Sequence, residues 1–552
     1  MQRRAGTVVL VVLVVASAFA GSAIAAGPGP DPGTEPDGAP GAAPPAADTA
    51  PADPDADVIG WEAGYWYNES IAVNQSDGLN DSALHAVVAR TMARVEVIRQ
   101  LEFERTVPLE VVGREEFSQR QQNRTVSAAL RTFDNAKFEA LFLVPETTDS
   151  IEVQQRNRGG IILGQYNFRT DEMLVVSGGE TTRAINELTL AHELMHALQD
   201  QHFNLSRHRP RTRDGANAKN GLIEGDAKVV EHRYRQRCNG GGWAGSCLQP
   251  TGLQGGGGDL AHVGTYLLKY MPYSEGAEFV STLYGQEGWS AVNDAYANPP
   301  ASSEQVIHPG KYLEDDPANV TLEDRQTDDW RRVRPPGRPD YGSVGESAVF
   351  MMLWYPGFDS RRGTEIVPYR SFLNLTGGGE ISSFQPYIYD HRYSAGWDGD
   401  RLHVYENEAN ETGYVWRLVW DSPADAQEFL EGYRGVLSYW GGEEVRPGVW
   451  VIEEGGFADA FHVAVKGDTV TIVNAPTVDA LPSVRRGVSV TPTPTRTRRP
   501  TTSLPPTGRT VTVESGTPTL DRTTTPGQPG FGAVAGLLGL AGAALLGWRR
   551  RR

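Results

Sequence analysis

The chain has 552 residues, which is long enough for two or three domains. Its 69 acidic residues outnumber the 51 basic ones, only six of which are lysine, and the formal net charge is -18. An acidic surface of this kind repels phosphate groups, so the composition argues against nucleic acid as a partner.

The N-terminal segment has the three parts of an export signal. The basic start Gln2-Arg3-Arg4 precedes an apolar run from Val8 to Ala20, and small residues follow up to Ala26. We therefore predict a signal peptide over residues 1–26, with an uncleaved N-terminal anchor as the alternative. Residues 27–58 are rich in Pro, Ala and Asp and lack large apolar side chains, which predicts a disordered linker.

The first part of the ectodomain, residues 59–345, mixes helical and strand patterns. Apolar spacing predicts a helix over Ser82–Phe103, capped by Asp81 or Ser82. Ile161–Tyr166 and Met173–Val176 are expected to be two strands on either side of a polar turn. Two further helices are predicted at about Thr182–Gln201 and Ala218–Arg235.

The first of these two helices carries the motif His192-Glu193-x-x-His196. Residues four apart share one face of a helix, so both imidazoles can bind one Zn²⁺. Glu193 can then act as the general base that takes a proton from a zinc-activated water. Because the motif fixes only three positions, the alternative is a core helix that carries two histidines by chance.

A third ligand is expected from the following helix. Glu224 stands at its apolar start, where an unpaired carboxylate would be costly to bury and a metal would remove that cost. The alternative is an exposed or capping glutamate. Glu231 and His232 fall in a charged stretch that we expect to be solvated. Asp200 is a candidate to orient a ligand histidine, or else a polar residue that ends the helix.

Two further features fit an exported chain. Cys238 and Cys247 flank a short Gly-rich segment and are a candidate disulfide. Eight Asn-x-Ser/Thr sequons are candidate N-glycosylation sites. They are Asn68, Asn74, Asn80, Asn123, Asn204, Asn319, Asn374 and Asn410.

Residues 346–485 are expected to form a smaller C-terminal α+β module. Its predicted strands are Tyr414–Trp420, Val449–Ile452, Phe461–Val465 and Val470–Val473, and Asp421-Ser422-Pro423 begins a helix. No catalytic spacing is visible in this module, so we expect a packing, positioning or surface-interaction role.

The motifs His192-Glu193-x-x-His196-x-x-x-Asp200 and Glu224-Gly225-Asp226-Ala227, with Ser303-Glu304-Gln305-x-x-His308-Pro309-x-Lys311-Tyr312, resemble a group of secreted gluzincin-like proteins. The resemblance implies a zincin-like fold, in which the active-site helix lies beside a mixed sheet, and Glu224 as third zinc ligand. It also makes His308 or Tyr312 a candidate for stabilising the oxyanion. Known peptidase families usually carry an acidic residue four positions after the ligand glutamate, whereas this chain has Lys228.

The C-terminal end is expected to anchor the chain. Residues 486–528 are rich in Thr and Pro and predict an extended stalk. In residues 529–552, Pro529-Gly530-Phe531 is followed by an apolar run to Trp548 and four arginines, which resembles the PGF-CTERM sorting signal of archaeal surface proteins. The resemblance implies recognition by an archaeosortase, removal of the apolar tail and attachment of a lipid near Pro529-Gly530-Phe531, whereas the apolar run and the arginines alone predict only a C-terminal membrane anchor. The acidic, lysine-poor composition is also similar to that of proteins from halophilic archaea, although GC-rich codon usage would favour Arg over Lys as well.

Together these features predict a cell-surface zinc metallopeptidase that hydrolyses peptide or protein substrates. The alternative is a non-catalytic binding or structural protein, for example one associated with an S-layer, that retains a zinc site. An intact Glu193 favours the enzyme, because a structural zinc site needs ligands but no general base.

Overall fold

The computed structural model describes residues 52–75, 78–122, 126–161, 163–177, 184–207, 209–249 and 260–490. The predicted signal peptide, most of the linker, the greater part of the stalk, the C-terminal tail and Asn123 lie outside these ranges. No helix within the ranges combines the length and the apolar character needed to cross a membrane.

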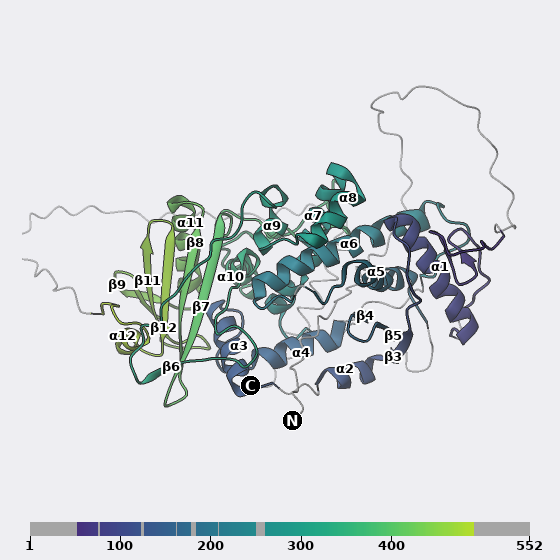
Figure 1. Cartoon of the computed structure of the whole chain (residues 1–552). Helices are drawn as coiled ribbons and strands as arrows, with labels where there is room; N and C mark the ends of the chain where they lie inside the picture. Colours follow the sequence, from purple (N-terminus) through teal and green to yellow (C-terminus); the bar gives the residue numbers. More distant parts are fainter. Residues whose placement is uncertain are drawn as a thin grey trace, which may run out of the picture. The chain divides into compact units, whose positions relative to one another are not determined.

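The described part of the chain is a mixture of helices and antiparallel or mixed sheets, which confirms the α+β class (Figure 1). The helices are α1 (Asp81–Arg99), α2 (Arg114–Gln122), α3 (Ala128–Ala140), α4 (Ser150–Ile161), α5 (Glu187–Phe203), α6 (Arg213–Asn239), α7 (Val263–Glu287), α8 (Trp289–Ala297), α9 (Ser303–Ile307), α10 (Glu346–Asp359), α11 (Pro423–Tyr439) and α12 (Leu481–Val484).

Three sheets accompany these helices. A two-stranded ribbon consists of β1 (Trp61–Glu62) and β2 (Tyr65–Trp66). The second sheet has the order β3-β5-β4, in which β5 (Glu172–Ser177) runs parallel to β3 (Leu109–Gly113) and antiparallel to β4 (Gly164–Asn167). The third sheet has the order β6-β7-β8-β12-β11-β10-β9 and is antiparallel throughout. Its strands are β6 (Trp330–Arg332), β7 (Trp397–Asn407), β8 (Thr412–Trp420), β9 (Glu443–Arg446), β10 (Val449–Val451), β11 (Ala460–Lys466) and β12 (Thr469–Ala475).

The large sheet carries the C-terminal core. Helix α11 begins as expected, with Ser422 as N-cap and Pro423 at its first position. It packs Phe429 on Trp420 of β8, with ring centroids 4.8 Å apart. Phe142, just after α3, contacts Tyr433 of α11 and Phe461 of β11, so the segment after α3 joins the same core. The described residues up to Val488 accordingly belong to one compact unit.

Several element boundaries differ from the sequence-based expectation. Ile161 ends α4 instead of beginning a strand, so the strand before the turn is limited to β4. The N-cap of α1 is Asn80, whose side chain accepts a hydrogen bond from the Ala83 amide, and not Asp81 or Ser82. Helix α6 begins at Arg213, five residues earlier than predicted, because Thr212 caps it through the Gly215 amide. The pairing of β3 with β5 joins segments about sixty residues apart, and periodicity alone did not reveal it.

Candidate metal centre

Helix α5 presents both histidines of the HExxH motif on one side. Its N-cap is Asn186, whose side chain accepts hydrogen bonds from the amides of Leu188 and Thr189. The helical spacing brings the rings of His192 and His196 to a centroid distance of 4.9 Å. Both residues are fully buried, with exposed fractions of 1% and 0%. The ring of Tyr273, from α7, stacks on that of His192 at 6.2 Å.

Glu224 approaches the two histidines from α6. Its Oε2 atom lies 3.4 Å from Nε2 of His192 and 3.4 Å from Nε2 of His196. The close crossing of α6 and α7 next to this residue depends on glycine. A Cβ atom on Gly225 would lie 2.0 Å from the Gly276 carbonyl oxygen, so no larger residue fits without moving a helix.

The three side chains fit the donor set of a zinc ion. His192 Nε2, His196 Nε2 and Glu224 Oε2 are all buried, and apart from one another they have no partner among the described residues. Ligand atoms of the three residues lie within 4.8 Å of one another. Three buried ligand atoms that meet only one another need either a proton or a cation between them, and two imidazoles with one carboxylate suit Zn²⁺.

The other ring nitrogens of both histidines are held by buried side chains. His192 Nδ1 lies 3.2 Å from Glu231 Oε2, and His196 Nδ1 lies 2.8 Å from Gln199 Oε1. Gln199 in turn donates to the Ile223 carbonyl at 2.9 Å, which links α5 to the residue before Glu224. With a metal on Nε2, each Nδ1–H would donate to these oxygens and fix the ring orientation.

These contacts decide between the two alternatives for Asp200 and correct the expectation for Glu231. Asp200 does not orient a ligand histidine: it accepts hydrogen bonds from the Leu205 amide at 2.7 Å and from the Tyr166 hydroxyl at 3.2 Å. Glu231 is not solvated, because α5 covers it and leaves an exposed fraction of 7%. Lys228, at the position where known peptidase families usually carry an acidic residue, pairs with Glu231 at 3.3 Å. The acidic residue beside the ligands thus stands seven positions after Glu224 instead of four.

Glu231 is held in its charged form by this arrangement. Burial opposes ionisation, but Lys228, His192 and Arg235 together hold the pKa of Glu231 well below its usual range. Arg235 contributes an ion pair at 2.5 Å. A permanently charged acceptor beside His192 favours the tautomer in which Nε2 is free to bind a metal.

Glu193 lies between the histidines and the edge strand β4. Both of its carboxylate oxygens are buried, no side chain of a described residue is hydrogen-bonded to them, and the Tyr166 amide of β4 is their backbone neighbour. A Cβ atom on Gly164 would lie 2.7 Å from Glu193 Cγ, so this carboxylate lies directly against the β4 backbone. Burial raises the pKa of Glu193 to about 7, although His196 and His192 oppose the rise.

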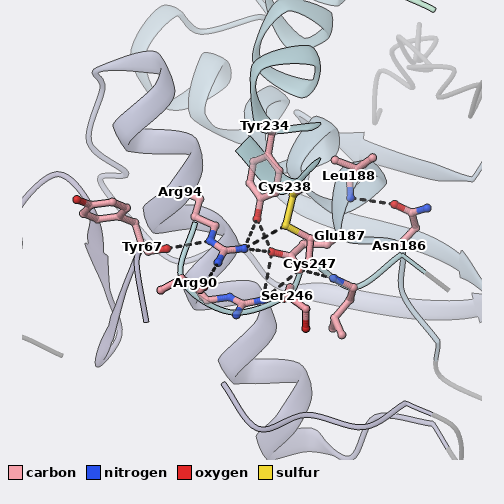
Figure 2. The surroundings of a disulfide bond; sticks show 12 residues. Tyr67, Arg90, Arg94, Asn186, Glu187, Leu188, Tyr234, Cys238, Ser246 and Cys247 are labelled. Carbon is pink, nitrogen blue, oxygen red and sulfur yellow. Dashed lines mark hydrogen bonds and ion pairs between the residues drawn. A yellow bond between two sulfur atoms is a disulfide. The ribbon is translucent and has the colours of Figure 1, made fainter. Parts of the chain in front are cut away.

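The start of α5 is fixed by buried charges and by the disulfide loop (Figure 2). Glu187, the first residue of α5, pairs with Arg90 at 3.1 Å and Arg94 at 2.7 Å, both from α1. Cys238 and Cys247 form a disulfide with a Cα separation of 5.8 Å. The chain leaving it exchanges two hydrogen bonds with Glu187: the Leu248 amide donates to the carboxylate, and the Glu187 amide donates to the Leu248 carbonyl. Sequence reasoning missed these arginines, whose regular spacing on α1 was the available signal.

The remaining candidates lie elsewhere. His308 pairs with Glu346 at 3.0 Å, and the Tyr312 hydroxyl donates to the Asn298 carbonyl at 2.6 Å. The structure therefore does not bring His308 and Tyr312 to the metal centre. Of the seven described sequon asparagines, all are exposed except Asn374, whose Nδ2 donates to Gln385 Oε1 at 3.3 Å.

Comparison with family models gives two matches. Residues 331–485 match a domain of unknown function (DUF8575), which includes most of β6 and the rest of the large sheet. Residues 528–550 match the PGF-CTERM motif. Neither match covers the candidate metal centre. No curated protein and no solved structure matches the chain.

The second match identifies the sorting signal of an archaeal surface protein. A PGF-CTERM motif is processed by an archaeosortase and implies export with a C-terminal membrane anchor at the cell surface.

Proposed function

We propose that the protein is a cell-surface zinc-dependent peptidase of the zincin type. The observation that carries the proposal is the convergence of three buried ligand atoms from His192, His196 and Glu224, which meet only one another, beside the buried carboxylate of Glu193. A Zn²⁺ bound there would supply a Lewis acid and lower the pKa of a water molecule.

Residues near the metal would then have two separate roles in hydrolysis, proton transfer and the positioning of the ligands. Glu193 accepts the proton of the attacking water and delivers it to the leaving amine, a role that suits a carboxyl group whose pKa burial has raised. Glu231 and Gln199 hold the two ligand rings in place.

An extended peptide would bind along the outer edge of strand β4. Strand β4 is an edge of its sheet, and among the described strands it pairs with β5 alone. A substrate segment that pairs with the outer edge of β4 would pass Gly164 and therefore run beside Glu193. This supports a peptide or protein as substrate.

A non-catalytic zinc protein is the second candidate. It is favoured by the near-complete burial of all three ligand side chains, which is typical of structural zinc sites. Glu193 argues against it, because a structural site needs ligands but gains nothing from a further buried carboxylate next to them.

A single substitution separates the two candidates. Glu193→Gln keeps the shape of the side chain but cannot accept the proton. We expect zinc-loaded wild-type protein to cleave members of a diverse peptide library, and Glu193→Gln to retain its zinc and lose cleavage. Glu172→Gln is the matched control. Glu172 is an exposed glutamate on β5, in the same sheet as β4, and this variant should cleave normally. Cleavage at an undiminished rate by Glu193→Gln, or no cleavage by the zinc-loaded wild type, would refute the peptidase proposal.

A further inference from the structure

A second group of ligand-type side chains lies where α3 meets the large sheet. Glu139 is in the last turn of α3, Glu146 follows six residues after that helix ends, and Asp459 immediately precedes β11. Carboxylate oxygens of the three residues lie within 4.8 Å of one another. Glu139 and Asp459 are buried, with exposed fractions of 4% and 3%, whereas Glu146 reaches solvent.

No positive charge balances this group within the described part of the chain. None of the three carboxylates forms an ion pair with a described basic residue, and the charged neighbours that shift their pKa values are themselves acidic, Glu411 included. Burial, followed by repulsion from Asp459 and Glu146, raises the pKa of Glu139 well above its usual range. Converging carboxylates in a buried setting require either bound protons or a bound cation.

An independent observation favours a cation. Asn474, on β12, has an exposed fraction of 1%, and its Nδ2 donates to Asp459 Oδ2 at 2.8 Å, so its amide lies within the group. The Oδ1 atom of the same amide is buried and has no hydrogen-bond partner. Glu139 and Asp459 are hydrogen-bonded to each other, which requires a proton on one of them. A metal ion among the carboxylates would replace that proton and would supply the lone acceptor of Asn474 with a partner.

We propose that Glu139, Glu146, Asp459 and Asn474 form a calcium site. All four donors are oxygen atoms, which Ca²⁺ prefers and Zn²⁺ does not. Two oxygens that share a Ca²⁺ at 2.3–2.6 Å are at most about 4.6–5.2 Å apart, and the separation of the three carboxylates fits that limit. The solvent-facing side of Glu146 leaves room for the water ligands that complete six to eight positions.

Such an ion would join two parts of the chain. It would tie the end of α3 and the following segment to the start of β11 and to β12, which lie in the portion matched by the domain of unknown function. An exported protein meets Ca²⁺ at far higher concentrations than a cytoplasmic one, so a weak site suffices. The inference does not depend on the zinc centre or on peptidase activity.

Calorimetric titration of the purified full-length protein tests the site. Metals are first removed with a chelator and one equivalent of Zn²⁺ is restored, so that the histidine centre cannot take up the added ion. We expect one Ca²⁺ to bind with a Kd of about 10⁻⁴–10⁻³ M, as in other extracellular modules. At a Ca²⁺ concentration of 100 Kd, the Tm should rise by roughly 3 °C.

Variants locate the bound ion. Glu139→Gln and Asp459→Asn should each weaken Ca²⁺ binding at least tenfold. Should either fail to fold, Glu146→Gln changes an exposed side chain and should weaken binding in a folded protein. Glu454→Gln, an exposed glutamate in the loop before Asp459, is the control and should bind as the wild type does. No binding at millimolar Ca²⁺, unchanged affinity in the folded variants, or equal affinity for Mg²⁺ would overturn the calcium assignment.

Discussion

Replacing Gly164 with alanine should disable catalysis without removing the metal. The added Cβ would lie 2.7 Å from Glu193 Cγ and 2.8 Å from its Oε1, whereas non-bonded carbon atoms rest about 3.5–4.0 Å apart. Glu193 or strand β4 must therefore move by about 1 Å. A displacement of that size at a reacting group costs on the order of 10²-fold in rate.

The assay compares kcat, zinc content and thermal unfolding of Gly164→Ala with those of Gly113→Ala. Gly113 lies in β3 of the same sheet, and a Cβ there meets no atom within 4 Å. We expect roughly a 10²-fold loss of kcat for Gly164→Ala, one zinc per chain in both variants, and near-wild-type activity for Gly113→Ala. Full activity of Gly164→Ala would show that Glu193 does not act as the general base from its position against the β4 backbone.

Three further predictions follow from other contacts. Glu231→Gln should weaken zinc affinity by about 10–100-fold in a chelator competition assay, whereas Asp200→Asn should leave it unchanged, and equal effects would contradict the assigned contacts. Replacing both Cys238 and Cys247 with serine should lower the free energy of unfolding in urea by about 2–3 kcal/mol, and an unchanged value would show that the disulfide loop adds no stability. Burial raises the pKa of Glu96 from 4.5 to about 9, against the lowering effect of the Phe103 and Gly60 amides. Between these two pH values the folded chain keeps a proton on Glu96 that the unfolded chain has lost. The free energy of unfolding should therefore fall as pH rises from 4.5 towards 9. Glu96→Gln should reduce that fall by at most ~1.4 kcal/mol per pH unit in unfolding experiments at pH 5, 7 and 9. The same pH dependence in the variant and the wild type would refute the role given to Glu96.

The sequence predicted the local part of the candidate site well. The spacing of His192 and His196 is a property of one helix, and the structure does place them on one side of α5. Glu224 was expected from the following helix, and the two helices pack so that it meets both rings.

The supporting residues were harder to predict because they depend on contacts between helices. The charged residues around Glu231 predict a solvated side chain. Glu231 nevertheless stands two turns after Glu224, so it shares the face of α6 that meets α5. That seven-residue spacing was the signal that could have identified it. The strand β4 was predicted three residues too early because Ile161 and Ile162 look like strand residues, whereas Ile161 ends α4. Short apolar runs cannot separate a helix end from a strand start.

Metal analysis of the purified protein tests the central claim most directly. After metal removal, incubation with excess Zn²⁺ and desalting, the account predicts one zinc per chain in the wild type. The predicted zinc content is far below one per chain in His196→Ala and Glu224→Ala, while the exposed-site variant Glu172→Gln remains at one. A wild-type protein that retains no zinc, or variants that retain as much as the wild type, would contradict the account.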